Sequence, residues 1–129
     1  MNPITEKILT GTLGELLVQI RLLQYGVQAA RPIKDSGNDL IAVNDKEFRA
    51  VSVRTTTTGT YSKPEADRQY HVLAVVFLVG QEREVSLDGS QLFFIPHAEV
   101  ATVPTDCGRL GKFKFSRELV ETLFGRLPA

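Results

Sequence analysis

The octapeptide Val72-Leu-Ala-Val-Val-Phe-Leu-Val79 is an almost unbroken run of β-branched and apolar side chains. A strand with one face in water alternates apolar and polar residues, whereas a strand covered on both faces does not. The run is also far shorter than the roughly 20 apolar residues of a membrane-spanning helix. We therefore expect residues 72–79 to form the core strand of a β-sheet, and we expect no membrane partner.

Shorter strand patterns flank this run on both sides. Before it, two segments separated by Asn44-Asp45-Lys46 predict a hairpin, and after it Asp88-Gly89 is the expected turn of a second hairpin. The connection of fifteen residues at 55–69 is long enough for the crossover that parallel strands need, and one helical turn is expected near Glu65. The expected strands are Val27–Ile33, Asp39–Val43, Phe48–Arg54, Val72–Val79, Val85–Leu87 and Gln91–Ile95.

Helix patterns lie towards the two ends of the chain. The first runs from about Pro3 to Tyr25, with Asn2 as its cap and Gly26 after its end. Its apolar residues form two opposite stripes, so we expect the helix to be covered on two sides. One stripe is Leu13, Leu16, Leu17, Ile20 and Leu23, and the other is Ile4, Ile8, Gly11, Val18 and Leu22. A short helix from Pro96 to Val100 and a C-terminal helix capped by Ser116 follow. The predicted fold class is α/β, a mixed β-sheet with an N-terminal helix and a C-terminal helix packed on it.

Composition limits the classes of function. The chain has 129 residues, which suits one domain over residues 1–129. Fifteen basic and fifteen acidic residues exclude a generally cationic coat, so any contact with nucleic acid must be a local patch. The single Cys107 has no disulfide partner, and this favours a cytoplasmic location. His71 and His97 lack metal-like spacing and are read as structural or surface histidines.

Two carboxylates stand out by their positions. Glu15 falls inside an apolar stripe of the first helix, where an unpaired carboxylate is costly. Arg54 or Lys34 could therefore pair with it in a purely structural bridge. Asp39 follows the turn-forming Ser36-Gly37-Asn38. It is either a turn acid that accepts backbone hydrogen bonds or a ligand, and the sequence leaves both readings open.

Three segments together resemble a known family of nucleases. They are Gly11-Thr-Leu-Gly-Glu15, Asp35-Ser-Gly-Asn-Asp39-Leu-Ile-Ala-Val43 and Val51-Ser-Val-Arg54-Thr-Thr56. In these segments the sequence resembles the PD-(D/E)XK nuclease superfamily, particularly its small members similar to archaeal Holliday-junction resolvases. The resemblance implies a restriction-endonuclease-like fold. It also implies a divalent metal, Mg²⁺ or Mn²⁺, held by Glu15, Asp39 and the main-chain carbonyl of Val53.

The sequence departs from the family at two positions. The family usually holds Glu or Gln and then Lys, two residues apart on one strand face, whereas this chain has Ser52 and Arg54. The implied catalytic set is therefore Glu15, Asp39, Ser52 and Arg54. A serine is a poor metal ligand, and a guanidinium only donates hydrogen bonds, so Arg54 can bind phosphate but should not accept a proton. A metal-free site with an internal ion pair is the alternative to a bound metal.

Basic residues interleaved with aromatics occur between Arg109 and Arg117. Such a pattern can follow a phosphate backbone. The same alternation fits an edge strand with Lys112 and Lys114 in water and the intervening phenylalanines packed inward. Arg49, Lys63 and Arg68 could extend a patch beside Arg54 if the regions adjoin. The residues expected to bind nucleic acid are Arg54, Arg49, Lys63, Lys112 and Lys114.

Three functions follow as hypotheses. The first is a nuclease-fold protein with a degenerate catalytic site that binds DNA or serves a DNA-processing assembly. The second is an active metal-dependent endodeoxyribonuclease. The third is a protein-binding module, such as an immunity or assembly partner, for which an exposed apolar patch or a symmetric homodimer would be the mark.

Overall fold

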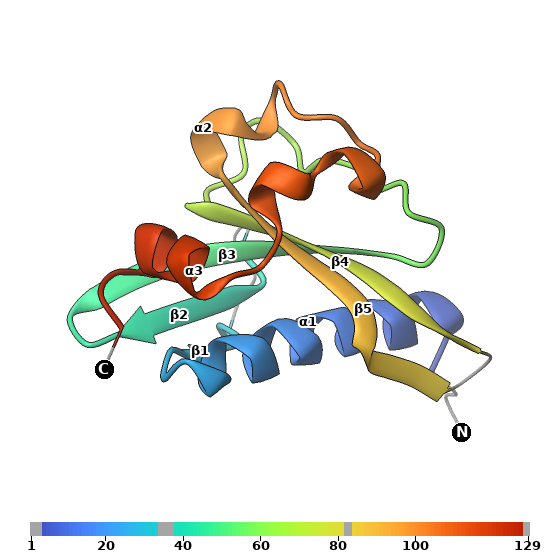
Figure 1. Ribbon diagram of the computed structural model, residues 1–129, viewed down its shortest axis with the longest axis horizontal. Coiled ribbons are helices and arrows are strands. Elements are labelled where there is room, and N and C mark those ends of the chain that lie inside the picture. The colour runs from blue at the N-terminus through green and yellow to red at the C-terminus, as the bar shows by residue number, and fades with distance from the viewer. Residues whose placement is uncertain (1–3, 34–37, 82–83, 128–129) are drawn as a thin grey trace.

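The computed structural model describes residues 4–33, 38–81 and 84–127, and it shows the expected mixed α/β fold (Figure 1). Five strands form one sheet in the order β1-β2-β3-β4-β5, in which β3 and β4 are parallel and every other neighbouring pair is antiparallel. The strands are β1 (Gln28–Ala30), β2 (Leu40–Asn44), β3 (Glu47–Thr56), β4 (Val72–Gln81) and β5 (Glu84–Pro96). The helices are α1 (Glu6–Gln24), α2 (His97–Val100) and α3 (Arg117–Phe124), with 3-10 turns η1 (Cys107–Arg109) and η2 (Gly111–Phe113).

Strand β4 is the core strand that its sequence predicts. All side chains from Val72 to Val76 are buried, and β4 lies between β3 and β5. The parallel pairing of β3 with β4 requires a crossover, which residues 57–71 provide without a helix. The single turn expected near Glu65 is present, and it is closed by a 3.1 Å hydrogen bond from the Arg68 amide to the Glu65 carbonyl.

Helix α1 begins later than its sequence suggested and is covered on one side only. Thr5 caps it, because the Thr5 hydroxyl accepts a hydrogen bond from the Ile8 amide; Asn2 and Pro3 lie outside the described residues. The buried residues are Gly14, Leu17, Val18 and Leu22. The expectation that both apolar stripes of the helix are covered is wrong. Leu16, Ile20 and Leu23, which form the outward stripe, are 47%, 44% and 63% exposed. A helix lying on a sheet presents one face to it, so the opposite stripe faces outward.

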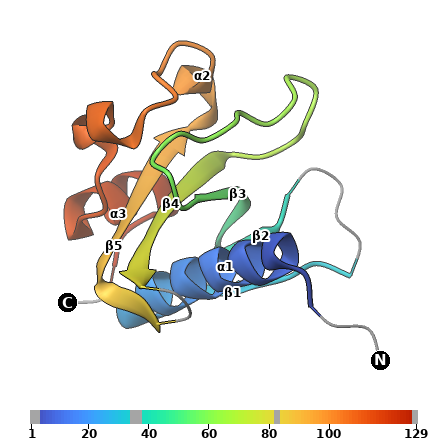
Figure 2. The same cartoon turned by 90° about the vertical axis from the view of Figure 1, so that its right-hand side faces the viewer.

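Two cores lie on the two faces of the sheet. Figure 2 shows α1 on one side of the sheet and α2 on the other. The α1-side core includes Leu17, Val18, Leu22, Val51, Val53, Ala74, Phe94, Val120 and Phe124, so α1 and α3 share one face. The α2-side core includes Tyr61, Tyr70, Leu73, Val75, Phe93, Ile95, Val100, Cys107, Leu110 and Phe113. The crossover, α2 and the 3-10 turns therefore cover the second face.

The second expected hairpin turn is wrong. Strand β5 continues through Asp88 and Gly89, and the pairing with β4 shifts register between Phe77 and Val79. The Ser86 hydroxyl accepts a hydrogen bond from the Gly89 amide at 2.9 Å, so the turn-forming residues make a bulge inside the strand. The segment between β4 and β5, residues 82–83, lies outside the described residues.

The edge strand expected between Arg109 and Arg117 is also largely wrong. This segment contains η2 and joins β5 only through the Phe93–Lys114 bridge and a 2.9 Å bond from the Phe115 amide to the Leu92 carbonyl. The predicted sides hold: Lys112 and Lys114 are exposed, Phe113 is buried and Phe115 is half-buried. No helix in the described part of the chain is long and apolar enough to cross a membrane.

Candidate functional site

The residues that the sequence predicted to form one site lie on opposite faces of the sheet at β3. Residues opposite each other on adjacent strands share a face of the sheet. Arg54 pairs with Val75 of the α2-side core, whereas Val53 pairs with Ala74 of the α1-side core. Ser52, two residues from Arg54, shares the face of Arg54. Both therefore lie on the face opposite α1, which carries Glu15.

Glu15 is held by a cation, as its position in the helix required. Its Oε1 lies 3.2 Å from Arg31 Nε, and its side chain is 16% exposed while that of Arg31 is 67% exposed. The described partner is thus Arg31, and Lys34 lies outside the described residues. An ion pair exposed on one side is screened by water, so its role is to satisfy the half-buried carboxylate more than to add stability.

Asp39 lies immediately before β2 and binds the backbone of the neighbouring strand β3. Its Oδ2 accepts a 2.7 Å hydrogen bond from the Val53 amide, and its own amide donates to the Val51 carbonyl at 2.8 Å. Asp39 also lines a pocket of about 360 Å³ with Arg31, Pro32 and Ile33. Arg31 therefore connects the surroundings of both acids, and the backbone hydrogen bonding expected of a turn acid is present.

The positively charged side chain of Arg54 is partly buried within the protein. Its side chain is half-buried, and its Nε is buried with no hydrogen-bond partner among the described residues. Burial raises the pKa of the nearby Tyr70 hydroxyl above its ordinary value, and the positive charge of Arg54 opposes this rise. Arg54 thus belongs to the surroundings of Tyr70 on the α2 side. Ser52 is buried beside it.

The metal ligands implied by the resemblance are two carboxylates, Glu15 and Asp39, and the main-chain carbonyl of Val53. No group of three His, Cys, Asp or Glu side chains in residues 4–33, 38–81 and 84–127 could hold a metal ion. Asp39 accepts a hydrogen bond from the Val53 amide, and Glu15 pairs with Arg31, which lines the same pocket as Asp39. Two carboxylates next to a guanidinium carry a small net charge, which attracts a divalent ion weakly.

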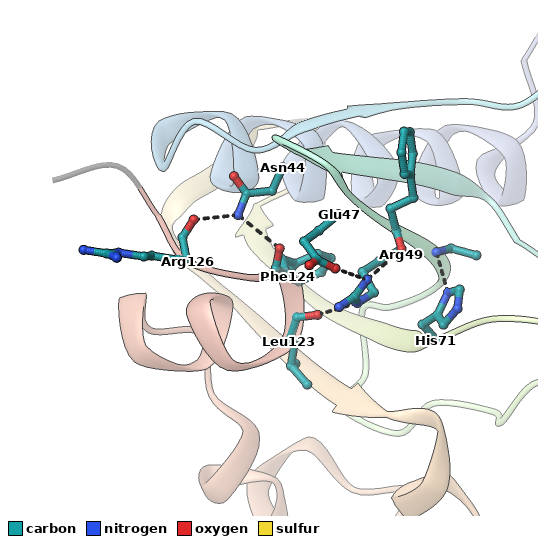
Figure 3. Close-up of polar contacts among 9 residues, drawn as sticks. Asn44, Glu47, Arg49, His71, Leu123, Phe124 and Arg126 are labelled. Carbon is teal, nitrogen blue, oxygen red and sulfur yellow. Dashed lines mark hydrogen bonds and ion pairs between the residues drawn. The ribbon is translucent and has the colours of Figure 1, made fainter.

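The basic residues expected to bind nucleic acid do not form one patch. Arg49 lies on the face opposite Arg54, where its Nε donates to the Leu123 carbonyl of α3 at 3.0 Å and it pairs with Glu47 (Figure 3). Its alternation with Arg54 along β3 is the physical reason. Lys63 and Lys112 both meet the α2 region, through the Ala101 carbonyl and Glu99 respectively. Lys114 is exposed at the edge of β5.

One pocket was missed by the sequence reasoning, and it uses both histidines. Its volume is about 440 Å³, and it lies where β4 begins and β5 ends. The Ala50 amide donates to His71 Nδ1 at 2.9 Å (Figure 3). The His97 amide donates to the His71 carbonyl at 2.9 Å. The lining residues are Asn38, Ala50, Arg68, Gln69, Tyr70, His71 and His97. The signal available in the sequence was that each histidine flanks an apolar strand, because adjacent strand ends bring their flanking residues together.

The chain was compared with protein-family models, curated protein sequences and solved structures. No protein-family model and no curated protein sequence matches the chain. Among solved structures, the chain is similar to a bacterial homing endonuclease, I-Ssp6803I, with a TM-score of 0.55 and 16% identity. The fold is nuclease-like. The match covers 78% of this chain and 72% of the endonuclease, and at this identity it shows the shared fold alone.

Proposed function

We propose that this chain is a nuclease-fold protein of the PD-(D/E)XK type that binds DNA and does not cleave it. The observation that supports this is the position of Arg54. Its guanidinium stands at the last position of the motif, faces away from α1 and Glu15, and keeps a buried Nε without a hydrogen-bond partner among the described residues. A guanidinium can hold a phosphate but cannot take a proton from an attacking water.

The two acids support binding without cleavage for a related reason. Glu15 is paired with Arg31, and Asp39 accepts the Val53 amide, so both carboxylates already have structural roles. Cleavage with Mg²⁺ or Mn²⁺ needs carboxylates that concentrate negative charge on the ion. The chain therefore acts as a DNA-binding component, and a DNA-processing assembly is the setting that suits such a protein.

A pair of assays tests this proposal. Gel shifts at low salt with duplex, single-stranded and branched DNA should show binding to at least one form, since phosphate contacts weaken as salt rises. Supercoiled plasmid incubated with Mg²⁺ or Mn²⁺ should stay intact. Arg54→Gln should weaken binding, and Arg54→Lys, which keeps the charge, should restore part of it.

Two outcomes contradict the proposal in different ways. Absence of a shift with every DNA form rejects DNA binding. Plasmid nicking by the wild type that disappears in Asp39→Ala shows an active metal-dependent endonuclease instead. Asp39→Asn is the matched control, because it keeps an oxygen that can accept the Val53 amide hydrogen bond.

The outward stripe of α1 favours a second candidate function, a protein-binding module. Leu16, Ile20 and Leu23 leave large apolar side chains in water on one helix face. Contiguous exposed apolar surface is a mark of protein contact. Light scattering over a range of concentrations tests self-association: a homodimer that Ile20→Glu dissociates supports this candidate. A mass that stays monomeric at every concentration, together with failure to co-purify a partner that Ile20→Glu releases, contradicts it.

A further inference from the structure

Helix α1 carries a regular apolar pattern on the side turned away from the sheet. Five residues, called the α1 seam below, follow one another at alternating intervals of four and three positions. They are Leu9, Leu13, Leu16, Ile20 and Leu23, and all are half-buried or exposed. This spacing is the heptad pattern by which one helix packs along another, and leucine and isoleucine are the residues that such positions favour. The α1 seam is therefore a surface shaped for a second helix.

The flanks of the α1 seam are uncharged. In a heptad pattern the flanking positions often hold Glu and Lys, which select a partner by charge. The flanking residues here are Thr10, Thr12, Leu17, Gln19 and Gln24. Glu15 and Arg21 are the charged residues between positions 9 and 24, and both are held elsewhere, Glu15 by Arg31 and Arg21 by the Leu87 carbonyl at 3.0 Å. A second copy of α1 offers an equally uncharged apolar ridge, so two copies meet without like-charge repulsion.

The two halves of the α1 seam differ in shape. Leu9 and Leu13 line a hollow of about 610 Å³ between α1 and the end of the β4–β5 hairpin, whereas Ile20 and Leu23 are exposed. The other residues that line the hollow are Glu6, Thr10, Thr57, Leu78, Val79, Gly80 and Val85. Leu9 and Leu23 are each seven positions from Leu16, so a twofold axis at Leu16 brings the exposed half of one seam onto the hollow half of the other.

The length of the α1 seam sets the strength of such a contact. From Leu9 to Leu23 the helix rises about 21 Å, and one helix pair of this length buries less than the roughly 800 Å² per partner of a standard interface. Helix α1 is already folded on its sheet, so association carries no cost of helix formation. We therefore expect a dissociation constant of about 1–100 μM.

We propose that a second copy of this chain occupies the α1 seam, with the two α1 helices antiparallel and a twofold axis at Leu16. The proposal rests on the protein-binding candidate above, which it deepens by naming the partner and the contact. Arg54 lies on the sheet face opposite α1, so the dimer leaves the Arg54 face of both copies accessible to DNA.

The first test measures the mass of the full chain by light scattering from about 1 to 500 μM, a range that brackets the expected dissociation constant. The wild type should change from monomer to dimer as concentration rises. Leu16→Glu should raise the dissociation constant at least about a hundredfold, because two carboxylates would meet at the axis. Ile8→Glu is the matched control, since Ile8 is 58% exposed on the same helix but lies outside the α1 seam.

Three results of the mass measurement overturn the proposal. They are a wild type that stays monomeric throughout, a dimer that Leu16→Glu does not weaken, and equal weakening by Ile8→Glu. The protein-binding candidate itself survives a monomeric wild type if a different partner co-purifies and Ile20→Glu releases it. The two ideas therefore fail separately.

Disulfide cross-linking tests the antiparallel arrangement. Leu16→Cys should form a covalent dimer on mild oxidation, because the axis brings the two copies of position 16 together. Leu23→Cys should not, since antiparallel packing separates its two copies by about 21 Å along the helices. The native Cys107 is buried, so the wild type is the uncross-linked control. Cross-linking of both variants indicates parallel helices and overturns the proposal, as does cross-linking of neither.

Gel shifts with Leu16→Glu separate this dimer from DNA binding. The variant should still shift DNA, because Arg54 lies on the opposite face of the sheet. A wild type that dimerises through the α1 seam but binds no DNA supports the dimer and contradicts the DNA-binding function. A monomer that binds DNA has the reverse meaning.

Discussion

Gly14 of α1 lies directly against Thr55 of β3, so closely that a Cβ at position 14 would overlap the Thr55 hydroxyl. Gly14 thereby sets the distance between the helix that carries Glu15 and the strand that carries Arg54. Alanine is intrinsically better than glycine inside a helix by about 1 kcal/mol. Whether an alanine at position 14 stabilises or destabilises the fold therefore depends on two free energies: the cost of the overlap with Thr55 and the gain in helix propensity.

We expect Gly14→Ala to lower the free energy of unfolding by about 1–3 kcal/mol, because overpacking outweighs the gain in helix propensity. Gly11→Ala is the control on the same helix, since nothing lies within 4 Å of a Cβ built there. That variant should gain up to about 1 kcal/mol. Urea denaturation of the two variants measures both values, and equal stabilisation would show that the Thr55 contact yields without cost.

Asn44 attaches the end of α3 to the β2–β3 hairpin. Its buried side-chain amide donates to the carbonyls of Phe124 and Arg126, both at 3.0 Å (Figure 3). Asn44→Ala leaves both carbonyls without this donor, so we expect a loss of about 2–3 kcal/mol in the free energy of unfolding. Gln19→Ala, which removes a single half-buried bond to the Ala29 carbonyl, should cost about 1 kcal/mol. A smaller loss for Asn44→Ala than for Gln19→Ala would contradict this ranking.

Buried groups on the α2 side predict a loss of stability in alkali. Burial is the main cause that raises the pKa of the Cys107 thiol above its ordinary value of 9.0, and the negative charge of Asp106 adds to the rise. A raised acid pKa in the folded state means that the unfolded chain releases this proton first, so stability is unaffected below about pH 9 and falls as pH rises above it. Tyr61 and Tyr70, whose pKa values burial also raises, extend the fall above their ordinary value of 10.0.

Urea denaturation of the wild type and Cys107→Ala at pH 7.5 and pH 10 isolates the thiol. The variant loses packing at both pH values, but its further loss between them should be smaller than that of the wild type. An identical loss in both proteins would show that the thiol does not contribute to the alkaline transition.

The pairing of Glu15 with Arg31 predicts weak affinity for divalent metal. Calorimetric titration with Mn²⁺ should give no saturable heat for the wild type at millimolar metal, because the guanidinium offsets one carboxylate charge. Saturable binding that both Glu15→Gln and Asp39→Asn abolish, but Glu121→Gln does not, would favour a metal-dependent nuclease. Glu121 is a suitable control because it pairs with Arg117 on the surface of α3.

Local pattern in the sequence was enough to predict β4, the β2–β3 hairpin, the body of α1 and the face alternation along β3. Each of these depends on side-chain periodicity or on a turn whose conformation is set by residues adjacent in the sequence. The same local reasoning predicted that Glu15 needs a partner, and Arg31 is a partner of it. It failed at Asp88-Gly89 because a turn-forming pair can also make a bulge when the partner strand continues beside it.

The placement of the site residues was decided by tertiary structure alone. Alternation fixes that Ser52 and Arg54 share a face, but only the packing of α1 on the other face separates them from Glu15. In the same way, His71 and His97 are 26 positions apart and meet because β4 and β5 pair with Val72 opposite Pro96. Sequence specifies which side chains a strand presents on each face, whereas the face that a helix covers is settled by the free energy of packing the whole chain.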